Sequence, residues 1–523
     1  MTIAIMTTVA IDFGTSNTVV CIQDPVTNSP QTLKFPSISR TFLQTNVIPS
    51  LVFIQNSEEF IIGEQVRSQR LGFVQPQRFF QGFKRELVAE FRSPSVQVDQ
   101  TVYSIEAIAQ IFIQAVWQQV LTQCQPTQVI FTAPVGAFAS YLSWFRQLAT
   151  SLALPPMQII DESTAAALGY AVGAGNGVLV LVIDCGGGTL DLSLVRTAKT
   201  EQLQPVLKAE VIAKSDAYIG GIDIDIWIGE YFLSRLGLTK SEIGNIGWLN
   251  LLEIAERMKI QLSSLEQVKE SWFDDEKFIA HELKLSQVEL GEILESRQLI
   301  EQIRQVLDEV LAIAYGKGVS KLEIQQVLMV GGSSQIKAIQ DLIISYFGKS
   351  RVKMDKPIEA IGFGALALGQ FDIVEDYLRH GYAIRLWDNF TKSHYYFTLF
   401  ERGTKYPMER SQPLILQVAN NSQTEIRLDI GELADTAEIE LAYDAQGRMT
   451  SSRLQKHSDF RSLVDISSSR SSVNFKLNPA SEMGVDRLEI RFMVNAQRNL
   501  IATVKDLLTQ KVLLKEQAIA QLE

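Results

Sequence analysis

Hydrophobic positions in the first two-thirds of the chain change repeatedly between two spacings. Short apolar runs such as VAIDFG and QVIFTAP indicate strands, whereas AFASYLSWFRQLATSL and STAAALGYAVG place apolar residues at helical intervals. Strands that alternate with helices of this length are typical of a layered α/β domain. We therefore expect one α/β domain over residues 1–372.

The pattern changes near residues 370–390. Beyond them, short segments alternate apolar and polar residues, and both PLILQVANNSQTEIRLDI and DRLEIRFMVNAQRNLIATV have the form of β-hairpins. We expect a linker over 373–392 and a smaller β-rich domain over 393–510.

Two segments of this region lack the alternation. The serine-rich residues 450–473 are expected to form a mobile insertion or long loop, and residues 511–523 a short C-terminal tail.

Composition narrows the classes of function. The 523 residues carry a net charge of −11, which argues against a nucleic-acid or anionic-membrane partner. Three widely spaced cysteines show no metal-binding pattern and favour a reduced, cytoplasmic setting. The N-terminus has no signal-peptide pattern, and no apolar run reaches the length of a membrane helix.

One short motif occurs twice. Residues 9–20, VAIDFGTSNTVV, and residues 181–195, LVIDCGGGTLDLSLV, share an apolar strand, an Ile-Asp pair, a glycine turn with threonine and a second strand. Their separation is too large for a solenoid and suits two copies of one α/β unit. Two such hairpins could face each other across a cleft.

The chemistry of this repeat suits a nucleotide. Glycines let backbone N–H groups approach phosphate oxygens, and Thr15, Ser16 and Thr189 add hydroxyl donors. Asp12 and Asp184 would repel phosphate unless a hydrated Mg²⁺ lay between them. Two ordinary hairpins are the alternative, which the identical Ile-Asp pairs disfavour.

Three further features are ambiguous. Two glycine motifs either present backbone amides to an anion or sugar, or form ordinary tight turns; they contain Gly220, Gly221, Gly331, Gly332 and Ser333. Glu256, Lys259 and Ser263 share one stripe of a predicted helix over 251–266. This stripe either contacts a ribose and purine or faces solvent.

Many motifs occur in the order typical of one family. They are IDFGTSN, NVIPSLVFI, FFQGFKREL, VIFTAPV, IIDESTAAALGYAVG, VIDCGGGTLDLSLV, YIGGIDID, AERMKIQLSS, MVGGSSQI and EAIGFGALALG. Over about residues 9–370 the chain resembles the 70-kDa heat-shock (DnaK-type) chaperones of the actin/sugar-kinase ATPase superfamily. A weaker resemblance to their β-sandwich peptide-binding domain covers about 395–510. The implied fold is a two-lobed α/β actin-like ATPase domain, with duplicated units around a nucleotide cleft, followed by a smaller β-sandwich-like domain.

The resemblance implies roles for individual residues. Lys84 would stabilise charge on the transferring phosphoryl group, Glu162 would reach the metal site through water, and Pro134 would take part in signalling between domains. The implied catalytic residues are Asp12, Lys84, Glu162, Asp184, Thr189 and Asp191. Asp12 and Asp184 would hold Mg²⁺ through waters. The implied ATP/ADP contacts are Gly14, Thr15, Ser16, Asn17, Gly186, Gly187, Gly188, Thr189, Gly220, Gly221, Glu256, Lys259, Ser263, Gly331, Gly332 and Ser333. K⁺ is a further candidate cofactor.

The sequence departs from the family at several places. Ile260 and Gln335 replace arginines beside the adenosine, and Ile358 replaces an aspartate near the purine. The family's acidic, leucine-rich linker is not evident, and we expect its long helical lid to be lacking.

Three functions fit these observations. The first is a chaperone-like ATPase of low turnover that couples nucleotide state to binding of unfolded or extended polypeptide. A J-domain co-chaperone and a nucleotide exchange factor are further expected partners of such a protein, and roles in protein folding and the stress response would follow. The alternatives are a nucleotide-binding regulator or scaffold that lost the chaperone cycle and, less favoured, a small-molecule kinase.

Overall fold

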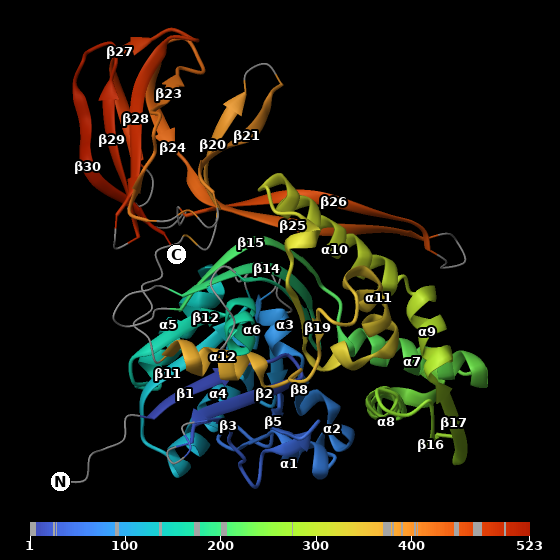
Figure 1. Cartoon of the computed structure of the whole chain (residues 1–523). Coiled ribbons are helices and arrows are strands. Elements are labelled where there is room, and N and C mark those ends of the chain that lie inside the picture. The colour runs from blue at the N-terminus through green and yellow to red at the C-terminus, as the bar shows by residue number, and fades with distance from the viewer. Residues whose placement is uncertain are drawn as a thin grey trace, which may run out of the picture. The chain divides into compact units, whose positions relative to one another are not determined.

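The chain forms two compact units, Met1–Ile373 and Val374–Glu523 (Figure 1). The computed structural model describes residues 7–522 apart from 25–26, 28, 89–93, 135–138, 172–177, 200–206, 275, 370–377, 379–380, 389–390, 402–403, 405, 444–448, 464–472 and 496–497.

The first sheet of the N-terminal unit places the first copy of the repeated motif at its centre. Its strand order is β12-β11-β1-β2-β5-β4, with β3 also paired to β2. The strands are β1 (Thr7–Asp12), β2 (Asn17–Gln23), β3 (Pro30–Thr32), β4 (Arg40–Phe42), β5 (Thr45–Pro49), β11 (Pro126–Ala133) and β12 (Met157–Asp161). Strand β1 pairs antiparallel with β2 and parallel with β11.

The second sheet repeats this arrangement around the second copy. Its order is β15-β14-β13-β18-β19, from β13 (Val178–Cys185), β14 (Leu190–Lys199), β15 (Leu207–Ala217), β18 (Gln326–Val330) and β19 (Val352–Lys353). Strand β13 pairs antiparallel with β14 and parallel with β18. The two motifs therefore lie in equivalent positions of two similar sheets, as expected for a duplicated unit.

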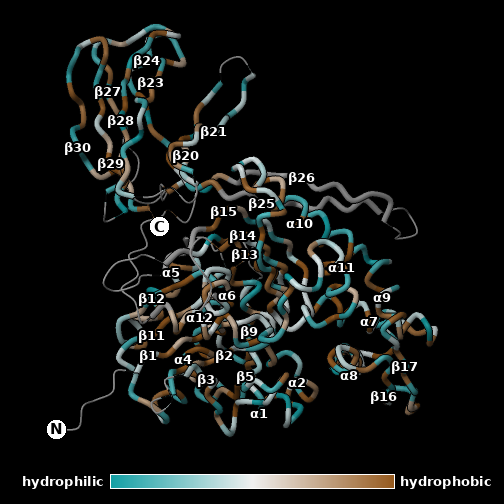
Figure 2. The backbone as a smooth tube through the Cα atoms, viewed as in Figure 1, coloured by the Kyte–Doolittle hydropathy of each residue, from teal (hydrophilic) through white to brown (hydrophobic). Residues whose placement is uncertain are grey.

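Helices complete two lobes with separate hydrophobic cores around the two sheets. They are α1 (Glu64–Ser68), α2 (Leu71–Val74), α3 (Phe83–Val88), α4 (Ile105–Gln123), α5 (Ala139–Ser151), α6 (Glu162–Ala171), α7 (Gly221–Leu236), α8 (Lys240–Gln261), α9 (Gln287–Ser296), α10 (Leu299–Gly316), α11 (Lys337–Phe347) and α12 (Ala360–Gly369). Apolar residues of α10 such as Ile303 and Leu307 are buried at helical spacing, and hydrophilic residues lie between them (Figure 2).

Helices α6 and α12 pack against each other in a core that includes residues of both sheets. A Cβ atom added to Gly364 would lie 1.7 Å from the carbonyl oxygen of Ala165, and one on Gly169 would lie 2.6 Å from that of Ala360. The helices approach this closely because both positions lack a side chain.

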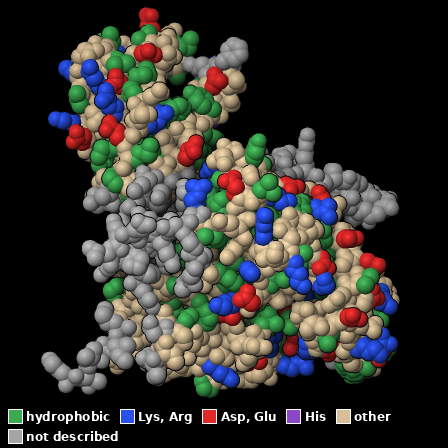
Figure 3. All heavy atoms as spheres, viewed as in Figure 1, with side chains coloured by type: hydrophobic (Ala, Val, Ile, Leu, Met, Phe, Trp, Pro, Cys, Tyr) green, Lys and Arg blue, Asp and Glu red, His purple; other side chains and the backbone are tan. Residues whose placement is uncertain are grey.

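Within the residues that the structure describes, the N-terminal unit also contains three smaller sheets. Their strands are β6 (Leu51–Ile54), β7 (Phe60–Ile62) and β8 (Phe79–Gln81) in one sheet, the pair β9 (Val96–Val98) and β10 (Thr101–Tyr103), and the pair β16 (Gln267–Asp274) and β17 (Ile279–Ser286). On the face visible in Figure 3, basic and acidic side chains are interspersed. Among the described residues, no helix combines the length and hydrophobicity that crossing a bilayer requires.

The described part of the C-terminal unit is built from strands. One sheet has the order β21-β20-β25-β26, another β22-β28-β29-β30 with β23 also on β28, and β24 pairs with β27. The strands are β20 (Gly381–Asp388), β21 (Ser393–Phe400), β22 (Met408–Glu409), β23 (Leu414–Gln417), β24 (Gln423–Leu428), β25 (Ile430–Tyr443), β26 (Met449–Ser462), β27 (Val473–Ser481), β28 (Asp486–Val494), β29 (Asn499–Asp506) and β30 (Val512–Gln521). Inward side chains of β20, β21, β23, β24, β27, β28, β29 and β30, together with Ile430 of β25, share one core.

One of the two predicted hairpins is confirmed. Strands β28 and β29 pair antiparallel across residues 495–498. The other prediction was wrong, because β23 pairs with β28 and β24 pairs with β27. Both strands alternate as expected, but alternation does not specify the partner strand.

Three predicted segments also differ from the structure. Residues 450–462 of the serine-rich segment belong to β26, which pairs with β25, because backbone pairing does not require apolar side chains. Residues 464–472 lie outside the described residues. Residues 381–388 of the expected linker form β20, paired with β21 and β25. Residues 512–521 of the expected tail form β30, whose backbone pairs with β29.

Candidate nucleotide site

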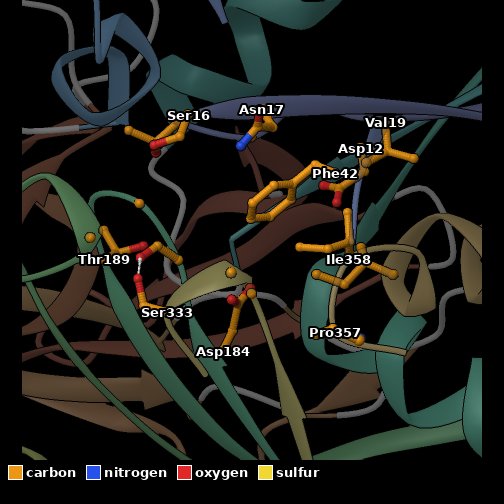
Figure 4. Close-up of a pocket in the computed structure, with 18 of the residues that line it drawn as sticks. Asp12, Ser16, Asn17, Val19, Phe42, Asp184, Thr189, Ser333, Pro357 and Ile358 are labelled. Carbon is orange, nitrogen blue, oxygen red and sulfur yellow. Dashed lines mark hydrogen bonds between the residues drawn. The ribbon is translucent and has the colours of Figure 1, made fainter. Parts of the chain in front are cut away.

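The glycine motifs of both lobes line one cavity of about 140 Å³ (Figure 4). Most of the sequence-predicted residues border it: Asp12, Gly14, Thr15, Ser16, Asn17, Lys84, Glu162, Asp184, Gly186, Gly187, Thr189, Gly221, Glu256, Lys259, Gly331, Gly332 and Ser333. Asp191, Gly188, Gly220 and Ser263 do not border it. The site is thus assembled from segments that are up to about 320 residues apart in the chain.

The glycine loops contact one another directly. A Cβ atom on Gly187 would lie 2.0 Å from Ser16 Oγ, and one on Gly220 would lie 2.5 Å from the carbonyl carbon of Gly187. The backbone N–H of Gly221 donates to the carbonyl of Gly186 over 3.0 Å, and Ser333 Oγ donates to the same oxygen over 3.1 Å. Side chains at these glycines would separate the loops.

A buried ion pair borders the cavity. Lys84, on α3, donates from Nζ to Glu162 Oε1, at the start of α6, over 2.8 Å. The side chains are only 8% and 9% exposed. Burial by itself would lower the pKa of Lys84, but Glu162, Tyr141 and Asp12 together outweigh it and hold this pKa above its usual value. Lys84 therefore presents a permanent positive charge at the cavity.

Several carboxylates lie around the Lys84 ammonium group, so negative charges are in excess at this part of the cavity. Asp12 accepts a 2.7 Å hydrogen bond from Thr132 Oγ1. Burial, together with the nearby carboxylates of Glu162, Asp191 and Asp12, raises the pKa of Asp184 well above its usual value. Asp191 faces Asp184 across the β13–β14 pair, and its burial raises its pKa to about 6. A cation at this site would relieve the repulsion among these groups.

No three His, Cys, Asp or Glu side chains in the described ranges are close enough together to ligate a metal ion directly. The donor set nevertheless suits Mg²⁺, which usually keeps several waters and takes only one or two carboxylates alongside phosphate oxygens. Asp12 and Asp184 both border the cavity and fit that limited role.

Two predicted nucleoside contacts already have protein partners. Lys259 Nζ donates to the carbonyl of Gly221 over 2.7 Å and lies 2.7 Å from Asp225 Oδ1. Glu256 forms ion pairs with Arg67 of α1 and, at 3.7 Å, with Arg40 of β4. Both side chains still border the cavity while they make these contacts.

Ser263 and Gln335 lie away from the cavity. Ser263 Oγ donates to the carbonyl of Ile260 over 2.7 Å and borders a separate small pocket beside α9. Gln335 Nε2 donates to Ser334 Oγ over 3.2 Å. Of the substituted positions, Ile260 and Ile358 do line the cavity.

Several lining residues were missed from the sequence, among them Asp225 and Phe42. Asp225 follows Gly221 by one helical turn, and burial raises its pKa to about 7. Its spacing from Gly221 was visible, but a carboxylate there is equally typical of an exposed helix face. Phe42 carries no motif, and only the fold brings it to the cavity.

The geometry by itself defines the class of protein. Two similar lobes around a glycine-lined cleft form an actin-like nucleotide-binding fold. The family model described as Hsp70 protein matches residues 147–439, more than half of the chain. The chain belongs to the Hsp70 family, a chaperone family whose members bind ATP, and its β-rich C-terminal unit is consistent with that family's β-sandwich.

Several curated relatives extend this similarity, all at low identity. "Chaperone protein DnaK" of Thermotoga petrophila is 26% identical over 448 residues, which cover 81% of this chain and 70% of that protein. "Chaperone protein DnaK" of Cenarchaeum symbiosum is 24% identical over 522 residues, covering 96% and 71%. "Heat shock 70 kDa protein, mitochondrial" of Solanum tuberosum is 25% identical over 455 residues, covering 81% and 64%.

Proposed function

We propose that this protein binds and hydrolyses ATP with Mg²⁺ and couples its nucleotide state to binding of unfolded or extended polypeptide. The observation that carries the proposal is the buried Lys84 ammonium group at a cavity lined by the glycine loops and by Asp12 and Asp184. Phosphoryl transfer to water needs fixed phosphates, compensated charge and an oriented water rather than covalent chemistry.

The residues divide this work by position. The amides of the loops around Gly14, Gly187 and Gly332 would hold phosphate oxygens, with the hydroxyls of Thr15 and Thr189 beside them. Bound Mg²⁺ would supply positive charge to the phosphates. Lys84 would stabilise negative charge that develops on the transferring group, and Glu162 would orient Lys84 through their hydrogen bond.

Polypeptide binding is assigned to the C-terminal unit. The proposal rests on family membership and on an architecture of paired strands, which can hold an extended chain through backbone hydrogen bonds. A J-domain co-chaperone, a nucleotide exchange factor, K⁺, a cytoplasmic setting and a role in protein folding under stress belong to the same proposal. The three cysteines, Cys21, Cys124 and Cys185, are free thiols, which suits a reducing compartment.

ATP turnover with and without an unfolded polypeptide tests this proposal. Wild type is compared with Lys84→Ala and Asp184→Asn, and with Lys284→Ala and Asp341→Asn as controls at exposed lysine and aspartate positions. We expect polypeptide to stimulate turnover in wild type and both controls, and both cavity variants to lose it.

Other outcomes favour the alternative functions. ATP binding without turnover in wild type would contradict the ATPase and indicate a regulator or scaffold, which the isoleucines at 260 and 358 favour. Turnover that depends on a sugar or other small acceptor would indicate a kinase.

A further inference from the structure

One end of the cavity is apolar. Phe42, Pro357 and Ile358 line this end beside the loop that contains Gly331 and Gly332, and Ile260 lines the same cavity. A Cβ atom on Gly332 would lie 3.5 Å from Phe42 Cε1 and 3.9 Å from Ile358 Cδ1. In Figure 4 the Phe42 ring projects between Asn17 and Ile358. An aromatic ring and branched aliphatic side chains therefore lie next to the proposed nucleoside loop.

The position of Phe42 is fixed by the backbone around it. Strands β4 and β5 form a hairpin in which Phe42 pairs with Thr45. The two turn residues, Leu43 and Gln44, both have positive φ, 45° and 66°, as a tight two-residue hairpin requires. Thr45 Oγ1 donates to Glu359 Oε2 over 3.0 Å, which ties the hairpin to the segment carrying Ile358.

Arg40 supports the ring from the same strand. Its guanidinium carbon lies 5.5 Å from the centroid of the Phe42 ring, within range of a cation–π contact. Its Nη2 also donates to Asn17 Oδ1 over 3.2 Å and lies 3.7 Å from Glu256 Oε1. The ring is thus held by Arg40, which does not line the cavity, within a polar network whose other members, Asn17 and Glu256, do line it.

Hydroxyl groups near this end are already engaged. Ser333 Oγ donates to the carbonyl of Gly186, and Ser334 Oγ donates to that of Gly331. Their protons are therefore used within the protein. The surface that remains beside Phe42 can recognise a flat ring by contact better than by hydrogen bonds.

We propose that a purine base stacks on Phe42 against Ile260 and Ile358, and that the site therefore distinguishes adenine from guanine poorly. The inference rests on the proposed nucleotide binding. Stacking is tolerant of base identity because every base offers a π face, and larger rings stack over more area. Strong discrimination would need buried groups that hydrogen-bond one base and are left unpaired by another.

Calorimetric titration in the presence of Mg²⁺ tests both parts. Wild type, Phe42→Ala, Phe42→Trp and Phe363→Ala are titrated with ATP, GTP, CTP and inorganic tripolyphosphate. Phe363 is a half-buried aromatic of the same hydrophobic cluster that does not line the cavity, so it controls for general loss of packing.

For wild type we expect ATP and GTP affinities within about tenfold of each other, with CTP weaker than both. Phe42→Ala should weaken ATP and GTP by about tenfold or more while leaving tripolyphosphate within about twofold. Phe42→Trp should keep the affinity for ATP, and Phe363→Ala should resemble wild type.

Each other outcome decides against a specific claim. Unchanged ATP binding in Phe42→Ala would overturn the stacking role. Tighter ATP binding in this variant would also overturn it and would show that the Phe42 ring blocks the site. A preference for ATP over GTP above about a hundredfold would overturn the poor discrimination. In all of these cases wild type still binds ATP, so the inference fails alone. If wild type binds none of the three nucleoside triphosphates, the proposed ATP binding fails as well.

Discussion

Each unit of the molecule contains a buried lysine–carboxylate or arginine–carboxylate pair, and the two pairs differ in their surroundings. Lys84 and Glu162 lie 2.8 Å apart in the N-terminal unit, and Arg487 and Asp506 lie 2.9 Å apart in the C-terminal unit. The second pair is buried even more completely, at 0% and 3% exposure. If burial alone indicated function, the Arg487–Asp506 pair would be the stronger functional candidate of the two.

Their neighbours separate the two pairs. Asp506 also accepts hydrogen bonds from the backbone N–H groups of Leu508 and Thr509, at 2.9 and 3.1 Å, so its carboxylate closes a turn between β29 and β30. Lys84 instead borders a cavity that further carboxylates also line. A buried ion pair indicates function when it borders a cavity with an excess of one charge, and indicates structure when backbone N–H groups complete the hydrogen bonds of its carboxylate.

Asp506→Asn should have the largest effect on stability. It leaves the Arg487 guanidinium buried without its counter-charge, which costs about 3–5 kcal/mol of unfolding free energy in comparable pairs. Hydrogen exchange of the β28 and β29 amides in the full chain measures this loss. Asp486→Asn, at an exposed aspartate on β28, is the matched control and should change protection little.

Acid should reproduce part of that loss in wild type. Burial would raise the pKa of Asp506, but hydrogen bonds from Thr509 and Arg487 hold it below its ordinary value of 3.8. Its stabilisation is therefore complete above that value and disappears as the pH falls through the lower folded-state pKa. Protection that is independent of pH in this range would contradict the assigned role of Asp506.

Lys84→Ala should separate activity from stability. We expect turnover to fall about 100- to 1000-fold, because a preorganised charge at the transferring group is lost. The unfolding free energy should fall by about 1 kcal/mol only, less than for Asp506→Asn, because Glu162 borders a cavity that water can enter. Denaturant unfolding and hydrogen exchange measure the stability of both variants. An equal loss in the two would contradict a functional role for the Lys84 pair and a structural role for the Arg487 pair.

Ser263→Ala should have the smallest effect. Its hydroxyl donates to the carbonyl of Ile260 and borders a different pocket, so ATP affinity should change by less than about twofold. Calorimetry measures this change. A loss of tenfold or more would place Ser263 at the nucleoside in the bound state and show that the helix end rearranges.

The sequence predicted those parts of the site whose residues form a recognisable motif with their neighbours in the chain. Asp12 and Asp184 each follow an apolar strand and precede a glycine turn, so their loops could be recognised as a pair. Phe42 could not, because nothing in its own neighbourhood distinguishes a cavity residue from a core residue. The pairing of Arg40 with Glu256 joins positions that only the closed fold brings together.

In the C-terminal unit, too, the sequence near a strand did not indicate which distant strand it pairs with. The alternation of β23 and β24 was visible, but the long-range pairing with β28 and β27 was not. Strand β26 contains many serines and still pairs along its length with β25, since the backbone supplies the hydrogen bonds.

The close crossing of α6 and α12 sets a limit on how the chain can vary. Neither Gly169 nor Gly364 has room for a methyl group, although neither lines the cavity. A random substitution library selected for activity would be depleted at these two positions as strongly as at Lys84. Only a parallel selection for folded protein would distinguish the glycines, whose loss removes the fold, from the lysine, whose loss leaves it.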